Sequence, residues 1–154
     1  MKEYEINDAT LAIIPNGKKS STIMEDDFQY QVDDTTLGII NYSCKYFGSS
    51  YNGRRDGAQE ILSSGYKLPI LIEDSQNLVF LPTNSPQNKD CVWLALNKIR
   101  TINKVPDDHE HVIVEFNNNK TLKVSGSYHS IQNQILRASR LESIIRNRKQ
   151  EKVL

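Results

Sequence analysis

Turn-forming residues repeatedly separate pairs of short apolar runs in this chain, and this alternation most limits the folds that it can adopt. Pro15-Asn16-Gly17 ends one apolar run, and Asn117-Asn118-Asn119-Lys120 lies between two others. Because glycine and asparagine tolerate the backbone angles of tight turns, these segments predict antiparallel hairpins. The expected strands are Tyr4–Pro15, Ser21–Val32, Pro69–Ile72, Leu78–Leu81, Cys91–Ile102, Val112–Phe116 and Thr121–Val124.

Three other segments have the spacing of helices. Apolar side chains recur at steps of three and four over residues 37–47, after the helix-start cluster Asp33-Asp34-Thr35-Thr36. A short helix containing Ala58, Ile61 and Leu62 is expected to end at Ser63-Ser64-Gly65. The clearest helix comes last, and its apolar face is formed by Ile131, Ile135, Ala138, Leu141 and Ile145.

Together these elements predict an α+β fold of mostly antiparallel β-hairpins, with two short helices mid-chain and one amphipathic C-terminal helix. The length of 154 residues fits one domain, and no internal repeat divides it. We therefore expect a single domain over residues 1–147, followed by a short basic tail over residues 148–154.

The formal net charge is zero, but the charges are unevenly distributed. Residues 1–36 hold eight acidic and three basic side chains, whereas residues 137–154 hold six basic and two acidic ones. This separation permits a local positive field on a neutral molecule, and it also permits contact between opposite ends of two subunits. The alternative is an acidic start and a basic end that serve no partner.

The sequence carries no membrane or secretion signal. No apolar run approaches the roughly 20 residues that span a bilayer, and the N-terminus lacks the basic-then-apolar order of a signal peptide. Cys44 and Cys91 lie far apart and form no Cys-x-x-Cys pair, so reduced thiols are expected. These features predict a cytoplasmic protein.

The segment Gly48-Ser-Ser-Tyr-Asn-Gly-Arg-Arg-Asp-Gly57 is the strongest candidate for a binding site. It has the glycine spacing of a phosphate-binding loop but lacks the Lys and Ser/Thr that would follow, so nucleotide hydrolysis is disfavoured. Glycines let backbone N–H groups approach an anion, and Ser49, Ser50 and Tyr51 can donate to phosphate oxygens. Arg54 and Arg55 supply guanidinium forks. The alternative is an interhelix turn whose arginines pair with nearby acids such as Asp56 and Glu60.

A second basic group lies on the last helix. Arg137 and Arg140 fall off its apolar face, which predicts an exposed basic ridge that could contact DNA. The helix dipole alone explains Arg146, Arg148 and Lys149, because cations are favoured at a helix C-terminus.

No catalytic or metal-binding constellation is visible. His109 and His111 share a face in an extended segment, but a closed metal site needs about four ligands and none completes the set. Neither cysteine has a histidine near it in sequence. We therefore expect a protein that is not an enzyme and needs no cofactor or metal.

Several motifs resemble the ComK-type competence transcription factors of Gram-positive bacteria, in family order over nearly the whole chain. The most specific is Phe47 to Gly53. The other matching segments are Tyr4 to Pro15, Ser43 to Gly57, Lys67 to Ile70, Leu81 to Pro86, Cys91 to Trp93, Ser127 to Ser130 and Asn133-Gln134.

The resemblance implies a transcriptional activator of DNA-uptake genes that binds paired A/T-rich promoter boxes, through the minor groove and as a dimer or tetramer. It also implies contacts with RNA polymerase and with an adaptor for proteolysis. The side chains and backbone groups expected to contact DNA are those of Lys45, Ser49, Ser50, Tyr51, Gly53, Arg54, Arg55, Arg137 and Arg140.

Longer family members continue into a tail linked to proteolysis and full activation, whereas this sequence stops at Leu154. One alternative is therefore a regulatory module that forms mixed oligomers with a longer member. Another is an RNA-binding domain, because a β-rich sheet with a basic helix would also serve that function.

Overall fold

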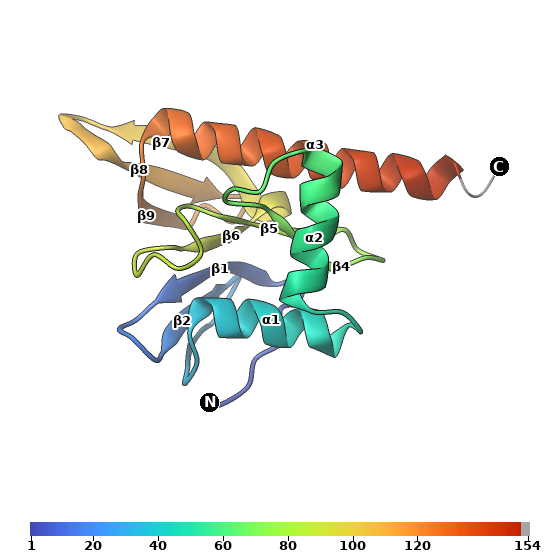
Figure 1. Ribbon diagram of the computed structural model, residues 1–154. Helices are drawn as coiled ribbons and strands as arrows, with labels where there is room; N and C mark the ends of the chain where they lie inside the picture. The colour runs from blue at the N-terminus through green and yellow to red at the C-terminus, as the bar shows by residue number, and fades with distance from the viewer. Residues whose placement is uncertain (152–154) are drawn as a thin grey trace.

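The computed structural model describes residues 1–151 and has the expected α+β architecture, with nine strands, three α-helices and one 3₁₀ turn among them (Figure 1). The strands are β1 (Thr10–Pro15), β2 (Ser21–Glu25), β3 (Gln29–Val32), β4 (Ile70–Glu73), β5 (Leu78–Pro82), β6 (Trp93–Ala95), β7 (Ile99–Val105), β8 (Asp108–Phe116) and β9 (Thr121–Ser125). The helices are α1 (Thr36–Tyr46), α2 (Tyr51–Leu62) and α3 (Tyr128–Glu151), and the 3₁₀ turn is η1 (Leu96–Lys98).

Two antiparallel sheets form the body of the molecule. The larger has six strands in the order β3-β2-β1-β6-β5-β4, and the smaller has three in the order β7-β8-β9. Three predicted hairpins are confirmed, namely β1–β2, β4–β5 and β8–β9. Asn119 has a φ of 71° in the last of these turns, as the asparagine-rich segment predicts.

Apart from its edge strand β3, the larger sheet is largely buried on both faces, which explains the nearly continuous apolar runs of β1, β4, β5 and β6. Along β5, Val79 and Leu81 pack into one core cluster, and Phe80 packs into the other. This alternation follows from the two-residue period of a strand. One cluster includes residues of the smaller sheet, α2 and α3, and the other includes residues of α1.

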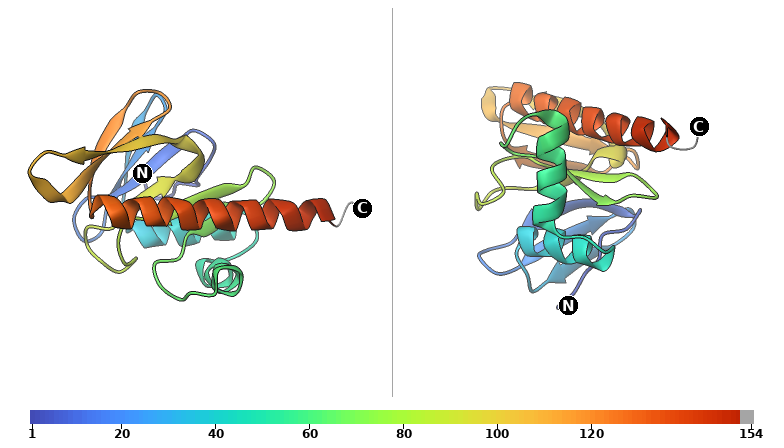
Figure 2. Two further views of the ribbon diagram at one scale, coloured as in Figure 1. Left: turned by 90° about the horizontal axis from the view of Figure 1, so that it is seen from above. Right: turned by 45° about the vertical axis from the view of Figure 1, so that its right-hand side comes forward.

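The three helices cover the sheets from three sides. α1 lies along one face, α3 lies across the smaller sheet, and α2 runs between the two helices along one side (Figure 1 and Figure 2). The last turns of α3 extend past the strands. The expected tail from residue 148 therefore overlaps this helix through Glu151, and residues 152–154 lie outside the described residues.

Three of the expected strands are wrong in extent. The first begins only at Thr10, and the second is interrupted at Asp26–Phe28, where the chain turns back to make β3 beside β2. The segment 91–102 is not one strand either, because η1 breaks it and carries the chain from the larger sheet to the smaller one.

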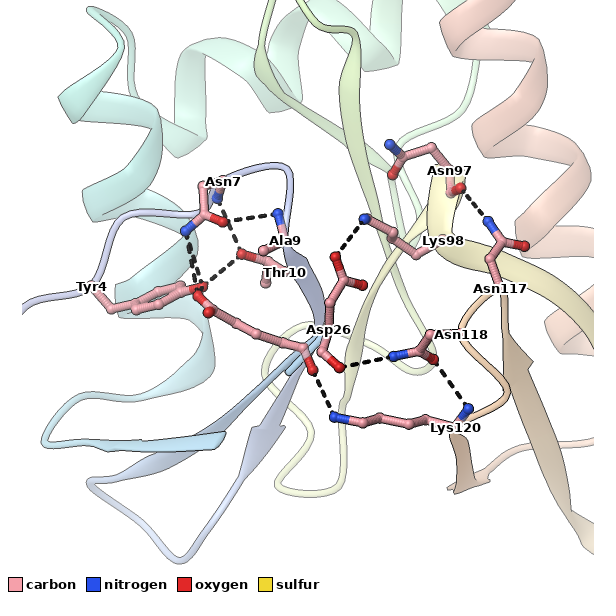
Figure 3. A network of polar contacts seen from close by, with 11 residues as sticks. Tyr4, Asn7, Ala9, Thr10, Asp26, Asn97, Lys98, Asn117, Asn118 and Lys120 are labelled. Carbon is pink, nitrogen blue, oxygen red and sulfur yellow. Dashed lines mark hydrogen bonds and ion pairs between the residues drawn. The ribbon is translucent and has the colours of Figure 1, made fainter. Parts of the chain in front are cut away.

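Polar contacts fasten the two sheets where this crossover occurs (Figure 3). Lys98 Nζ lies 3.1 Å from Asp26 Oδ2, and Lys120 Nζ donates to the carbonyl oxygen of Glu25 at 3.1 Å. Asn118 donates to the Asp26 carbonyl at 3.1 Å. The turn between β2 and β3 is thereby held against η1 and the β8–β9 turn.

Candidate nucleic-acid interface

The glycine-rich segment is the junction between α1 and α2, and its shape is set by the way in which α1 ends. The Gly48 N–H donates to the Lys45 carbonyl at 3.0 Å, and the Ser49 N–H donates to the Cys44 carbonyl at 2.9 Å. This pair of bonds is the Schellman motif, in which the residue after the helix cap adopts a left-handed conformation. Gly48 has a φ of 88°, so glycine is the residue that suits this position.

Most backbone N–H groups of the junction already have acceptors within the chain. Ser50 caps α2 by accepting from the Gly53 N–H at 3.0 Å, and its carbonyl accepts from Arg54 at the same distance. The Tyr51 N–H donates to Asn41 Oδ1 at 3.0 Å. In this first turn, the backbone N–H of Asn52 has no acceptor among the described residues. The expected row of free amides is therefore reduced to very few.

Two hydroxyl groups converge on the same turn. A Cβ atom at Gly53 would lie 3.2 Å from Ser50 Oγ and 3.4 Å from Ser49 Oγ, so both hydroxyls lie over this glycine. The missing side chain leaves them accessible at the positive end of α2. We call Ser49, Ser50, Gly53 and the Asn52 amide the hydroxyl cradle. Such a group can donate several hydrogen bonds to one phosphate.

Tyr51 does not join this cradle through its side chain. Its ring packs edge-on against Trp93, with centroids 6.4 Å apart and an interplanar angle of 90°. Burial raises the pKa of its phenol. The prediction that Tyr51 presents its hydroxyl to phosphate is therefore not supported by its position, and the ring instead anchors α2 to β6.

Arg54 and Arg55 have different surroundings and do not form a matched pair of guanidiniums around one anion. Arg54 is half-buried and lines a groove of about 230 Å³ between α2 and α3, together with Leu71 and Leu141. Arg55 donates to the Gly65 carbonyl at 3.0 Å and to Gln59 Oε1 at 3.4 Å. Five N–H donors are available on a guanidinium, so Arg55 keeps free ones.

The alternative interpretation of these two arginines is wrong in its partners. Neither forms an ion pair with Asp56 or Glu60 within residues 1–151, and Glu60 lies 3.6 Å from Arg148 instead. Arg55 stabilises the end of α2 by contacting a backbone carbonyl, which a sequence pattern does not reveal.

Arg137 is not part of an exposed ridge. Its guanidinium donates to the carbonyls of Lys67 at 3.2 Å and Tyr66 at 2.7 Å, and to Ser64 Oγ at 3.2 Å. Burial lowers the pKa of this guanidinium. The off-stripe position that predicted a ridge instead faces the loop after α2, so Arg137 fastens α3 to that loop.

Gln134 extends the same contact into the core. It is 3% exposed and donates to the carbonyls of Lys67 at 2.9 Å and Pro82 at 2.8 Å. We call Gln134 and Arg137, with the carbonyls that they contact, the α3 clamp. Sequence analysis missed it because both residues look like ordinary polar positions on a helix.

The remaining bases of α3 are mostly paired. Arg146 pairs with Glu142, Arg148 with Glu60, and Lys149 with Asp74 at 2.8 Å. Arg140 is exposed and forms no ion pair within the described part of the chain. Lys152 lies outside that part. The basic end of the sequence is thus largely neutralised by acids from α2, α3 and the β4–β5 turn.

Sequence analysis also missed two exposed aromatic rings at the end of α1. Phe47 was expected on the buried stripe but is 38% exposed, and Tyr46 is 60% exposed. The buried face includes Ile40 and Cys44 of the expected stripe, together with Thr36, Ile39 and Ser43. Phe47 is the helix cap, where the 3.6-residue period no longer fixes the side-chain direction. Lys45 beside them is exposed.

Other possible sites carry less. No group of three or more metal-ligating side chains forms within residues 1–151. His109 is exposed, and His111 lies 2.9 Å from the Asp108 carboxylate near the start of β8. No helix in residues 1–151 has the length and apolar character required to cross a bilayer.

Comparison with known proteins gives two matches. The family model described as ComK protein matches residues 1–150. The competence transcription factor of Bacillus subtilis (strain 168) is 34% identical over 152 residues, which cover 96% of this chain and 78% of that protein. No solved structure matches the chain.

Proposed function

Because this chain belongs to the ComK family, we propose that it is a DNA-binding regulator of transcription that activates competence genes. The similarity extends over almost the whole chain, and it includes the junction between α1 and α2. The relative's function as a transcription factor supports a role in regulation rather than in catalysis.

The observation that carries the proposal is the hydroxyl cradle. The Ser49 and Ser50 hydroxyls converge on Gly53 at the start of the 12-residue helix α2. The exposed Lys45 lies in the last turn of the preceding helix, α1. Hydroxyls, backbone N–H groups, helix N-termini and lysines are the groups that position proteins on DNA phosphates. Within the expected contact set, we assign Lys45, Ser49, Ser50 and Gly53 to direct contact with the backbone.

The arginines divide into two roles. Arg55 adds positive charge beside the cradle and keeps free donors, and Arg140 is a second contact from α3. Arg54, Tyr51 and Arg137 act by positioning, because their side chains are directed into the molecule. A neutral protein whose proposed interface holds so few free cations needs several subunits to add their phosphate contacts, which supports a dimer or tetramer on paired boxes.

We propose A/T-rich duplexes as the preferred sites, read through the minor groove. The minor groove of an A-tract is narrow and electronegative, and it attracts isolated cations such as Arg55 and Arg140. Its base edges distinguish poorly between A·T and T·A, so recognition depends on groove shape. Cytoplasmic localisation accompanies this function.

Fluorescence anisotropy tests the proposal with a labelled duplex that contains two A/T-rich boxes and a matched duplex with G/C substitutions. The protein is titrated at several salt concentrations. We expect tighter binding to the A/T duplex. We also expect Lys45→Ala to make the negative slope of log K against log salt shallower by about 0.9, the value for a single neutralised phosphate. Ser49→Ala weakens binding roughly ten- to hundredfold, because one hydrogen bond to a charged group, worth about 1.5–3 kcal/mol, is removed.

Lys18→Ala is the matched control, because Lys18 is an exposed lysine on the β1–β2 turn. Its binding should equal that of the unaltered protein. Equal affinity for both duplexes, or an unchanged salt slope in Lys45→Ala, would contradict the proposed interface. Binding only to a longer family member would support the mixed-oligomer alternative instead.

A further inference from the structure

Tyr46 and Phe47 form an aromatic pair on the surface at the end of α1. Their ring centroids are 5.1 Å apart with an interplanar angle of 82°, an edge-to-face arrangement. They are two of the few large apolar side chains left exposed in the described chain. Single exposed apolar residues are common, but two contacting rings make a local surface that water solvates poorly.

The aromatic pair is held in a fixed place. Tyr46 is the last residue of α1, and Phe47 is its cap. The Schellman bonds through Gly48 and Ser49 fix the chain directly after the pair, while the fully buried Ile40 and Cys44 anchor the helix below it. The rings are therefore presented on a rigid helix end rather than on a loop.

The position of the pair beside the cradle indicates its partner. Phe47 precedes Ser50 by three residues, so even an extended chain separates their Cα atoms by at most about 11 Å. Lys45 adds a positive charge on the same helix end. A surface with phosphate donors on one side and flat apolar rings next to them matches the two components of a nucleic acid, its backbone and its bases.

Resting on the proposed DNA-binding function, we propose that the aromatic pair is inserted against a base-pair step of the bound duplex and partly unstacks it. Apolar side chains that enter a step in this way kink DNA by tens of degrees. Pyrimidine–purine steps such as TA unstack most easily, so the pair contributes selectivity for A/T-rich sites without hydrogen bonds to bases.

The sheets argue for a duplex rather than a single strand. Proteins that bind single strands stack successive bases on aromatic side chains of an open sheet. Here both faces of the six-stranded sheet pack into the two core clusters, and its exposed strand positions are Gln29 and Gln31 of the edge strand β3. The smaller sheet has one Phe, Tyr or Trp, the fully buried Phe116, and its two histidines, His109 and His111, lie near the start of β8. Two rings at a helix end suit one step of a duplex and do not form a platform for a strand.

The experiment places 2-aminopurine at a TA step inside one A/T-rich box and follows its fluorescence, which rises when the base unstacks. A second duplex with donor and acceptor dyes at its ends reports bending. With the unaltered protein, we expect a severalfold rise in 2-aminopurine fluorescence and a shorter end-to-end distance. Tyr46→Ala combined with Phe47→Ala should abolish both signals and weaken binding about tenfold, because no ring then stacks against the base.

Phe28→Ala is the matched control, because Phe28 is 62% exposed on the turn between β2 and β3. It should leave both signals unchanged. The single variant Tyr46→Ala removes the more exposed ring without touching the cap, so it tests the proposal even if the double variant is poorly folded. We expect it to reduce both signals by at least half.

The outcomes separate this inference from the proposed function. Salt-dependent duplex binding with no rise in 2-aminopurine fluorescence, or a rise of undiminished size in Tyr46→Ala, overturns the inference and leaves DNA binding intact. Absence of duplex binding overturns both. Tighter binding to the single-stranded form of the same sequence would replace insertion with stacking on single strands.

Discussion

The cationic side chains expected to contact DNA lie in two regions of this molecule, the α1–α2 junction and the first half of α3, and their surroundings differ. At the junction, Lys45 is exposed and Arg55 keeps free donors beside a cradle of hydroxyls. On α3, Arg137 is committed to two carbonyls and a serine. The comparison teaches that an arginine can bind a partner only to the extent that the chain has left its donors unused.

The largest effect is expected when Gln134, the buried residue of the α3 clamp, is replaced. Gln134→Ala removes the side-chain donor of the buried Pro82 carbonyl, whereas the Lys67 carbonyl still accepts from Arg137. We expect the free energy of unfolding to fall by about 2–4 kcal/mol, because an unsatisfied buried carbonyl costs about 1–3 kcal/mol and the truncated side chain leaves a cavity. Urea unfolding measures it. The control Gln132→Ala, at an exposed position of the same helix, should change it by less than about 0.5 kcal/mol.

The two arginines of α3 give a sharper contrast. Arg137→Ala should lower the free energy of unfolding by about 1–3 kcal/mol and leave the affinity of the folded protein for DNA nearly unchanged. Arg140→Ala should do the reverse, with unaltered stability and several-fold weaker binding at low salt. Thermal unfolding and anisotropy on both variants decide the matter. If Arg137→Ala is as stable as the unaltered protein but binds DNA weakly, the prediction of an exposed basic ridge that contacts DNA would be correct.

Two glycines of α2 separate access to the cradle from helix stability. A Cβ at Gly57 would have no atom within 4 Å, so Gly57→Ala should stabilise the protein by up to about 1 kcal/mol through helix propensity. Gly53→Ala gains the same propensity but places its methyl group against Ser50 Oγ. We expect its stability to change little and its DNA affinity to fall severalfold. Equal affinities of the two variants for the A/T duplex would exclude Gly53 from the contact.

The smallest effect is a comparison of the two thiols. Cys44 lies under the junction and Cys91 lies at the start of β6, and burial raises the pKa of each to about 11. Both should therefore react with a thiol reagent at pH 8 only as fast as the protein unfolds. Single-cysteine variants in a labelling series measure this rate. Faster labelling at Cys44 would show that the junction opens on its own.

The same raised pKa values set a pH dependence. The unfolded thiols ionise near pH 9, whereas the folded ones stay protonated to about 11. The free energy of unfolding therefore falls as the pH rises between these values, since the unfolded state releases its protons first. Replacement of both cysteines with serine should remove this part of the alkaline destabilisation.

Local patterns predicted the hairpins and helices well, because turn residues and apolar periods act within a few residues. They failed where the outcome depends on distant partners. The segment 91–102 has continuous strand character, yet it breaks at η1, where Asn117 donates to the Asn97 carbonyl at 3.1 Å. The sequence of residues 91–102 does not predict this contact with Asn117, because Asn117 lies outside the segment.

The site was predicted only in part for the same reason. Ser49, Ser50 and Gly53 are close in sequence, so their proximity in space follows from the turn and the helix that they begin. Tyr51 and Arg137 face Trp93 and the Lys67 carbonyl, which are 42 and 70 residues away. A residue type states what a side chain can bind, and the fold decides whether an internal partner binds it first.

The central place of β6 has a consequence for biosynthesis. This strand of three residues pairs with β1 on one side and β5 on the other. Ile13 in β1 therefore cannot pair with its strand partner Trp93 until the ribosome has synthesised residue 93. At about 5–20 residues per second, a ribosome takes roughly 4–16 s to cover that interval. Until then the nascent chain carries two hairpins with unpaired inner edges, which are open to other chains. Slow translation between codons 15 and 93 would prolong this exposure, so the yield of folded protein depends on how quickly the ribosome reaches its single tryptophan.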